Sequence, residues 1–225
     1  RIDSNDKVPN PNVTVLEWLN TRPGVAGRVE AFGAWDVLPS IVNTARSGIP
    51  VGTAFTPSPK ASTARERELN QMARDLPAVW SYGSFDAPFV EAALEAMRAR
   101  DPRVVYVMLG EGDEWAHEGK YRLYVDAAHR ADRFFERLWT MAQSMPAYRG
   151  RTTLLVTTDH GRGATTKDWS DHGRDVPAAE DTWMFAMGPG IPALGVREGV
   201  TVTTAQFAAS IARAAGLSFA AAAPA

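Results

Sequence analysis

Short apolar runs alternate along the chain with longer stretches in which apolar residues recur every three to four positions. The short runs predict strands at 28–32, 51–55, 104–109, 152–158 and 183–187. Helical periodicity and capping residues predict helices at 14–19, 36–45, 65–74, 86–100, 120–145 and 203–215. Alternating strands and helices are typical of α/β proteins. We therefore expect a mostly parallel sheet flanked by helices.

Two of the predicted helices begin with an aspartate that is followed by proline. Asp36 is expected to cap the helix over 36–45, with Pro39 in its first turn. Asp86 is expected to cap the helix over 86–100, with Pro88 near its first position. Both expectations concern the aspartate side chain, which would accept a hydrogen bond from the first turn of its own helix.

Composition narrows the range of partners. The 225 residues carry a formal net charge of −2, so no general attraction to nucleic acid or to an anionic membrane is expected. No apolar run reaches the roughly 20 residues that a membrane helix needs. The chain has no cysteine, which excludes disulfides and thiolate metal ligands. Composition therefore gives no reason to expect nucleic acid or a membrane as a partner.

Metal-ligating residue types gather where predicted strands end. Asp159 and His160 follow the apolar run at 154–156, and Asp113 and His117 stand four residues apart after the run at 104–109. His172 comes twelve residues after His160, so three of the four histidines belong to this set. In open parallel sheets, ligands bind beyond the carboxyl ends of strands. Carboxylate and imidazole donors suit zinc or manganese.

The order of these motifs resembles the alkaline phosphatase superfamily. This group includes sulfatases, nucleotide pyrophosphatase/phosphodiesterases and cofactor-independent phosphoglycerate mutases. The segment PNVTVLEWL at 11–19 looks like the family's helix after its nucleophile. The remaining matching stretches are LGEGDEWAH at 109–117, TDHG at 158–161, DHG at 171–173, VP at 176–177 and FAMGPG at 185–190.

The resemblance implies an alkaline phosphatase-like core with two divalent metal ions, for which zinc is favoured and manganese is possible. Asp113, His117 and His172 would hold one ion, and Asp159 and His160 would hold the other. Two such ions would clamp a phosphoryl group while a Ser or Thr hydroxyl attacks phosphorus.

Two arginines flank the proposed ligands. Arg162 and Arg174 are candidates for contacts with a substrate phosphate or sulfate. His129, the fourth histidine, falls within the predicted helix at 120–145 and is expected on its surface.

The chain departs from the family pattern at its start. The family's second metal site also needs an aspartate on the first strand and the Ser or Thr nucleophile, and both precede the segment that matches 11–19. We therefore expect a single domain over 1–225 that is incomplete at its N-terminus, with the catalytic nucleophile outside this chain and little turnover from these residues alone. The missing segment or a second chain would then be a partner. Family habit and the non-methionine start favour an exported protein, periplasmic or secreted.

The function implied is metal-dependent hydrolysis of a phosphate ester, by a phosphomonoesterase or a phosphodiesterase. A phosphomutase or a sulfatase of the same superfamily is an alternative. The sulfatase is less supported, because the cysteine that many sulfatases mature to formylglycine cannot come from this chain. A non-catalytic metal-binding domain that has lost its nucleophile is the alternative from a different class. An upstream strand ending in aspartate would favour the enzyme.

Overall fold

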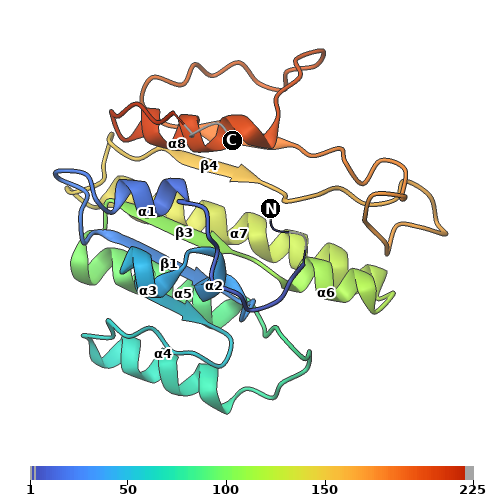
Figure 1. Cartoon of the computed structure of the whole chain (residues 1–225), viewed down its shortest axis with the longest axis horizontal. Helices are drawn as coiled ribbons and strands as arrows, with labels where there is room; N and C mark the ends of the chain where they lie inside the picture. The colour runs from blue at the N-terminus through green and yellow to red at the C-terminus, as the bar shows by residue number, and fades with distance from the viewer. Residues whose placement is uncertain (1, 3, 221–225) are drawn as a thin grey trace. The chain divides into compact units, whose positions relative to one another are not determined.

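The computed structural model describes residues 2 and 4–220, and Figure 1 traces their helices and strands in chain order. The chain divides into two compact units, Arg1–Glu114 and Trp115–Ala225. The division falls inside a short helix, α6 (Glu111–His117). Each unit is described by itself below.

The first unit is built on a three-stranded parallel sheet. β1 lies in the centre, between β2 and β3, and all five of its residues are buried. Gly33 at the end of β1 stands opposite Thr53 on one side and Met108 on the other, so the three strands end together. The expected α/β fold with a parallel sheet is therefore confirmed. The strands are β1 (Val29–Gly33), β2 (Val51–Thr53) and β3 (Val104–Met108).

Helices cover this sheet and complete its core. α5 contacts all three strands and also packs against α4. The side chains of Phe32, Phe89 and Leu69 join the sheet to these two helices in one buried cluster. Burying such side chains is the main source of stability for a domain of this kind. The helices are α1 (Val15–Leu19), α2 (Leu38–Ile41), α3 (Thr44–Ser47), α4 (Ala64–Asp75) and α5 (Ala87–Arg100).

The single helix predicted over 36–45 is wrong, because two short helices, α2 and α3, occupy this region. Asn43 lies between them in the left-handed conformation, with φ of 46°, and its side chain accepts a hydrogen bond from the N–H of Arg46. Asparagine tolerates this conformation better than most residues. Asp36 also does not cap the helix as expected, since its carboxylate pairs with Lys7 Nζ at 2.6 Å.

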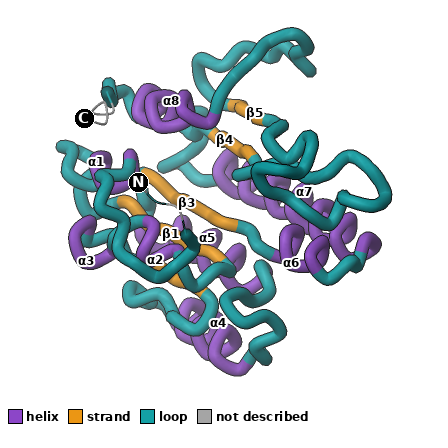
Figure 2. The backbone as a smooth tube through the Cα atoms, turned by 45° about the vertical axis from the view of Figure 1, so that its right-hand side comes forward, coloured by secondary structure: helices purple, strands orange, loops and turns teal. Residues whose placement is uncertain are grey.

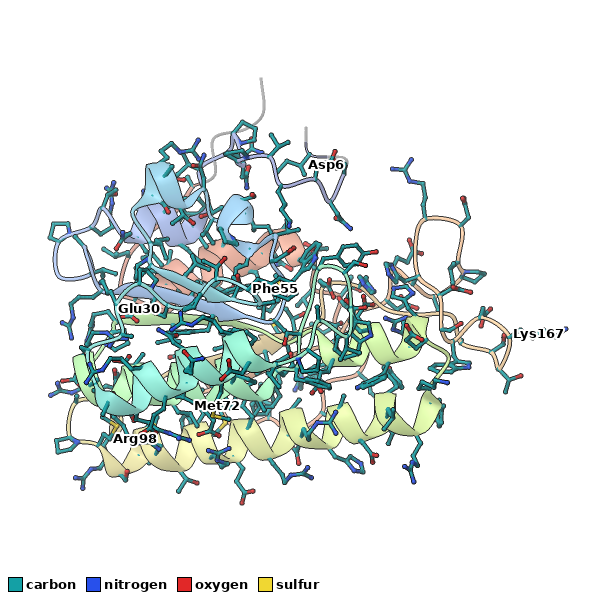
Figure 3. All side chains as sticks on the ribbon, turned by 90° about the horizontal axis from the view of Figure 1, so that it is seen from below. Asp6, Glu30, Phe55, Met72, Arg98 and Lys167 are labelled. Atoms are coloured by element: carbon teal, nitrogen blue, oxygen red, sulfur yellow. The ribbon has the colours of Figure 1, made fainter. Side chains whose placement is uncertain are left out.

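A buried ion network joins β1, α4 and α5 in the first unit. Arg100 binds Glu30 through two hydrogen bonds of 3.0 and 2.9 Å and also binds Glu66. The two carboxylate side chains are only 3% and 5% exposed. Figure 3 labels Glu30 on the sheet of this unit. Hydrogen bonding to Glu30, opposed by burial and supported by Glu66, raises the pKa of Arg100 above its ordinary value.

The second unit contains a long helix and a two-stranded sheet. β4 and β5 pair antiparallel, with Leu154 opposite Met187. Both strands were predicted, but the parallel arrangement expected for most of the sheet does not extend to this pair. The segment between them is loop (Figure 2), whereas parallel neighbours need a crossover connection that is usually a helix. The elements are α7 (Tyr121–Ser144), β4 (Leu154–Thr157), β5 (Met184–Met187), η1 (Thr204–Gln206) and α8 (Phe207–Ala214).

Within the described residues, none of the helices combines the length and the apolar character needed to cross a bilayer.

Replacing Arg100 with methionine should strongly destabilise the first unit. The change leaves Glu30 and Glu66 buried without their guanidinium partner, and breaking such a network costs about 3–5 kcal/mol. Urea unfolding of the full chain measures the loss. Arg98→Met is the matched control, because Arg98 is half exposed and pairs with Glu95 at 3.5 Å. We expect the control to cost less than about 1 kcal/mol, and an equal cost for both variants would contradict this account.

Stability should also fall in acid because of Glu66. Burial raises the pKa of this carboxyl, but hydrogen bonds from the Ser62 and Thr63 backbone and from Arg100 outweigh it and hold the pKa below its ordinary 4.5. The stabilisation is therefore complete above pH 4.5 and is lost as the pH falls through the folded-state pKa. Unfolding free energies of wild type and Glu66→Gln, measured from neutral pH to about pH 3, should converge towards the acid end. A constant difference across this range would refute the assignment.

Candidate metal centre

The first predicted ligand pair lies on α6, which begins directly after β3. A helix here was not predicted, although acidic residues fill its first turn, a composition that favours a helix N-terminus. Asp113 and His117 are four residues apart on this helix, so the periodicity of 3.6 residues per turn places them on one face. Asp113 is half-buried and His117 is exposed.

Asp86, which the sequence predicted as the cap of α5, instead holds the start of α6 through its side chain. Asp86 precedes α5 as expected, but its carboxylate accepts hydrogen bonds from the N–H groups of Gly110 and Glu111, at 2.7 and 3.2 Å. The first N–H groups of a helix need such an acceptor, and a negative charge is favoured there. Asp86 is therefore a positioning residue for the helix that carries Asp113 and His117, and the expectation that it caps α5 is corrected.

The second predicted pair follows β4. His160 Nδ1 lies 2.8 Å from the carbonyl oxygen of Gly161. Because a carbonyl only accepts, this contact places the proton on Nδ1 and leaves the lone pair of the neutral ring on Nε2. That nitrogen is 3.6 Å from Asp159 Oδ2, while Asp159 Oδ1 accepts the backbone N–H of His160. Metal-binding histidines commonly donate their other ring N–H to a carbonyl in this way.

His172 contacts both His117 and His160. We call these three residues the histidine cluster. The His172 ring stacks on that of His160 with centroids 3.7 Å apart and planes 16° apart. Its Nε2 lies 3.0 Å from His117 Nε2. The three histidines singled out from the sequence therefore do meet in space.

The donor separations fit metal coordination. A tetrahedral zinc ion with bonds of 2.0–2.2 Å places neighbouring ligand atoms about 3.3–3.5 Å apart. The separation of 3.0 Å between His117 and His172 and that of 3.6 Å between Asp159 and His160 both lie near this value. His160 and His172 also offer ligand nitrogens within 4.8 Å of each other. The cluster thus has the donor types and spacing for one ion or for two adjacent ions.

Tight loop packing holds these histidines in place. The N–H of Gly161 donates to the carbonyl of Ala179 at 2.8 Å, and the N–H of Gly163 donates to the carbonyl of Asp171 at 3.1 Å. A side chain at Gly161 would collide with the carbonyl oxygens of Asp181 and Ala178, the latter at 2.6 Å. Glycine is therefore required where the loop after β4 passes close to the backbone that follows His172.

The two predicted substrate arginines differ in their surroundings. Arg162 Nη1 donates to the carbonyl of Ser170 at 2.8 Å, and its guanidinium lies 5.9 Å from the centroid of the Tyr124 ring. Arg162 therefore ties the loop after β4 to the loop that contains His172. Arg174 is exposed, two residues past His172. A role in substrate binding remains a prediction for both.

Comparison with known families gives one match. Residues 81–179 match a family model described as the Metalloenzyme superfamily, which is part of the alkaline phosphatase-like superfamily. The matched range contains Asp86, all five predicted metal ligands and both arginines. No curated protein and no solved structure matches the chain. The resemblance stated from the sequence motifs is confirmed over this range, while the individual ligand assignments remain predictions.

Substituting Gly161 with alanine should disrupt the centre, because the added methyl group overlaps two carbonyl oxygens. We expect a loss of about 1–3 kcal/mol in unfolding free energy and a weaker affinity for zinc. Urea unfolding and competition with a chromogenic zinc chelator measure the two effects. Gly112→Ala is the control, because a Cβ there meets no described atom within 4 Å and the residue lies in α6. Equal behaviour of both variants would show that the loop is not tightly constrained.

Proposed function

Because residues 81–179 belong to the Metalloenzyme superfamily, we propose that this chain carries the divalent metal site of a phosphate ester hydrolase. The observation that carries the proposal is the histidine cluster. Three imidazole rings from distant parts of the sequence converge, and two of their Nε2 atoms approach to 3.0 Å. The distance of 3.0 Å also suits an N–H···N hydrogen bond between the two rings, so the convergence of three metal-ligating side chains supports the proposal more than this distance does.

The residues present would divide between two ions. His117 and His172 face each other and would share one ion. Asp113, four residues before His117 in the sequence, is the third ligand that the family resemblance implies for this ion. Asp159 and His160 would share the other, through the oxygen and the nitrogen that are 3.6 Å apart. Zinc is favoured because imidazole nitrogens dominate the donor set, and manganese is the second choice.

Bound divalent cations would polarise a phosphoryl group and neutralise the charge that develops during its transfer. The chain's own residues orient these cations. The hydrogen bond from His160 Nδ1 to the carbonyl of Gly161 fixes that ring so that Nε2 is the free donor. The Asp86 carboxylate fixes the start of α6 and hence the direction of Asp113 and His117. The nucleophile stays unassigned.

A phosphate ester is preferred to a sulfate ester on two grounds. Two dications together balance the dianion of a phosphate monoester better than a monoanionic sulfate ester, whereas a phosphate diester carries the same single charge as the sulfate ester. The chain also lacks cysteine, from which many sulfatases form their nucleophile. A monoester and a diester are both compatible with this set of donors, and the arginines Arg162 and Arg174 would meet the phosphate oxygens of either.

Zinc binding provides the first test. We expect the purified chain to bind zinc, and His172→Ala to lower the affinity at least about tenfold because this ring contacts both other histidines. His129→Ala is the matched control, since His129 lies exposed on α7 and should not affect binding. Elemental analysis after dialysis against buffered zinc measures both. Equal zinc content in the two variants would remove the basis of the proposed site.

Anion selectivity provides a second test, which separates the phosphate proposal from the sulfate alternative. Zinc-loaded protein should bind methyl phosphate, seen as line broadening in ³¹P NMR spectra, and a molar equivalent of the monoanion methyl sulfate should displace little of it. The metal-free protein should show weaker binding, because the cations supply most of the attraction. Methyl sulfate that competes as well as methyl phosphate would overturn the preference for phosphate esters.

A further inference from the structure

Three aromatic side chains form a group beside the histidine cluster. Tyr121 and Tyr124 lie in the first turn of α7, and Trp169 lies in the loop before His172. The Trp169 ring meets Tyr121 edge-on with centroids 5.1 Å apart, and it meets Tyr124 at 5.8 Å. We call these three residues the aromatic platform.

The platform is open to solvent. Tyr121 is 61% exposed although it is a large aromatic residue, and Tyr124 and Trp169 are half-buried. Trp169 and Tyr124 bury the larger part of their surface, so the exposed ring surface comes mainly from Tyr121, which Trp169 contacts edge-on. The exposed ring surface is therefore available to a ligand.

Short connections link the platform to the histidine cluster. Arg162 follows His160 by two residues, binds the carbonyl of Ser170 and lies over the Tyr124 ring. Ser170 lies directly between Trp169 and the Asp171–His172 pair in the sequence. The two loops are also joined by the hydrogen bond from the N–H of Gly163 to the carbonyl of Asp171. A molecule held at the histidines would thus have a cation and aromatic rings close to one end.

We propose that the aromatic platform binds a planar unsaturated ring carried by the ester, so that the preferred substrate is a phosphate ester of an aromatic or heteroaromatic group. This inference rests on the proposed function and adds the class of the leaving group. Stacking on an aromatic side chain suits any flat ring, and Arg162 beside Tyr124 adds a positive charge at the phosphate end. An aliphatic ester would gain the phosphate contacts but not the stacking.

Binding of two esters that differ only in the ring tests the proposal. Phenyl phosphate and cyclohexyl phosphate, which carry six-carbon rings that are planar and non-planar respectively, are titrated by equilibrium dialysis into the full chain, both zinc-loaded and zinc-free, with zinc content recorded on each sample. We expect phenyl phosphate to bind at least about fivefold more tightly, the effect of one stacked ring. Trp169→Leu should abolish this preference while zinc content stays unchanged. Trp169→Phe should restore part of it, which a purely structural role would not explain.

Trp139→Leu is the matched control. Trp139 lies on the same helix as Tyr121, about 27 Å further along at 1.5 Å per residue, and should leave the preference intact. If zinc-loaded protein binds both esters equally, the platform proposal is overturned and the metal site stands. If the protein binds no zinc, the proposed function fails. In that case the zinc-free titration tests the aromatic platform, because stacking needs no metal. Equal affinities of the zinc-free protein for the two esters would overturn the platform proposal as well.

Discussion

The parallel pairing of β1 with both of its neighbours is the constraint on which the first unit depends. A strand with partners on both sides must satisfy every backbone group through its ladder, and its side chains must be buried on both faces. All five residues of β1 are buried and in register with β3, and the last three are also in register with β2. The shared register makes the strands end together, and α6 begins where β3 ends. The direction of Asp113 and His117 follows from this arrangement.

One charged residue at each end of α5 supports the arrangement. At one end, Asp86 accepts the first N–H groups of α6, which a helix cannot satisfy internally. At the other, Arg100 neutralises two carboxylates that would otherwise be buried alone. Glu30 and Glu66 are buried and Asp86 is half-buried, and each of these charges has hydrogen-bond partners that offset its loss of hydration. Hydrogen bonds to charged side chains thus stabilise the first unit and also position the helix that carries the candidate metal ligands.

In the second unit, close contacts between backbone segments, and not a large hydrophobic core, hold the loops that carry the histidines. The histidines lie on a loop after β4, on a second loop, and at the end of α6. Glycines at 161 and 163 let these loops approach each other, and Arg162 adds a further hydrogen bond between them. Loops held in this way can present imidazole and carboxylate groups to a metal with little loss of entropy on binding. The aromatic platform shares these loops, so recognition of a ring and of a phosphate would be coupled through one small structure.

The sequence by itself determined most of the helices and strands and the types of residue that gather at the strand ends. Apolar runs at 104–109 and 152–158 and the period of the 120–145 segment predicted β3, β4 and α7 closely, because these patterns depend on neighbours within a few positions. Residue types and their order singled out the three histidines as candidate metal donors. Only the tertiary structure decided that Asp86 serves α6 and not α5, that Asn43 divides one expected helix into two, and that β5 runs antiparallel to β4. The stacking of the His160 and His172 rings was likewise visible only in the tertiary structure. Each of these features depends on contacts between backbone groups and side chains that are separated in the sequence. Local sequence patterns do not specify such contacts.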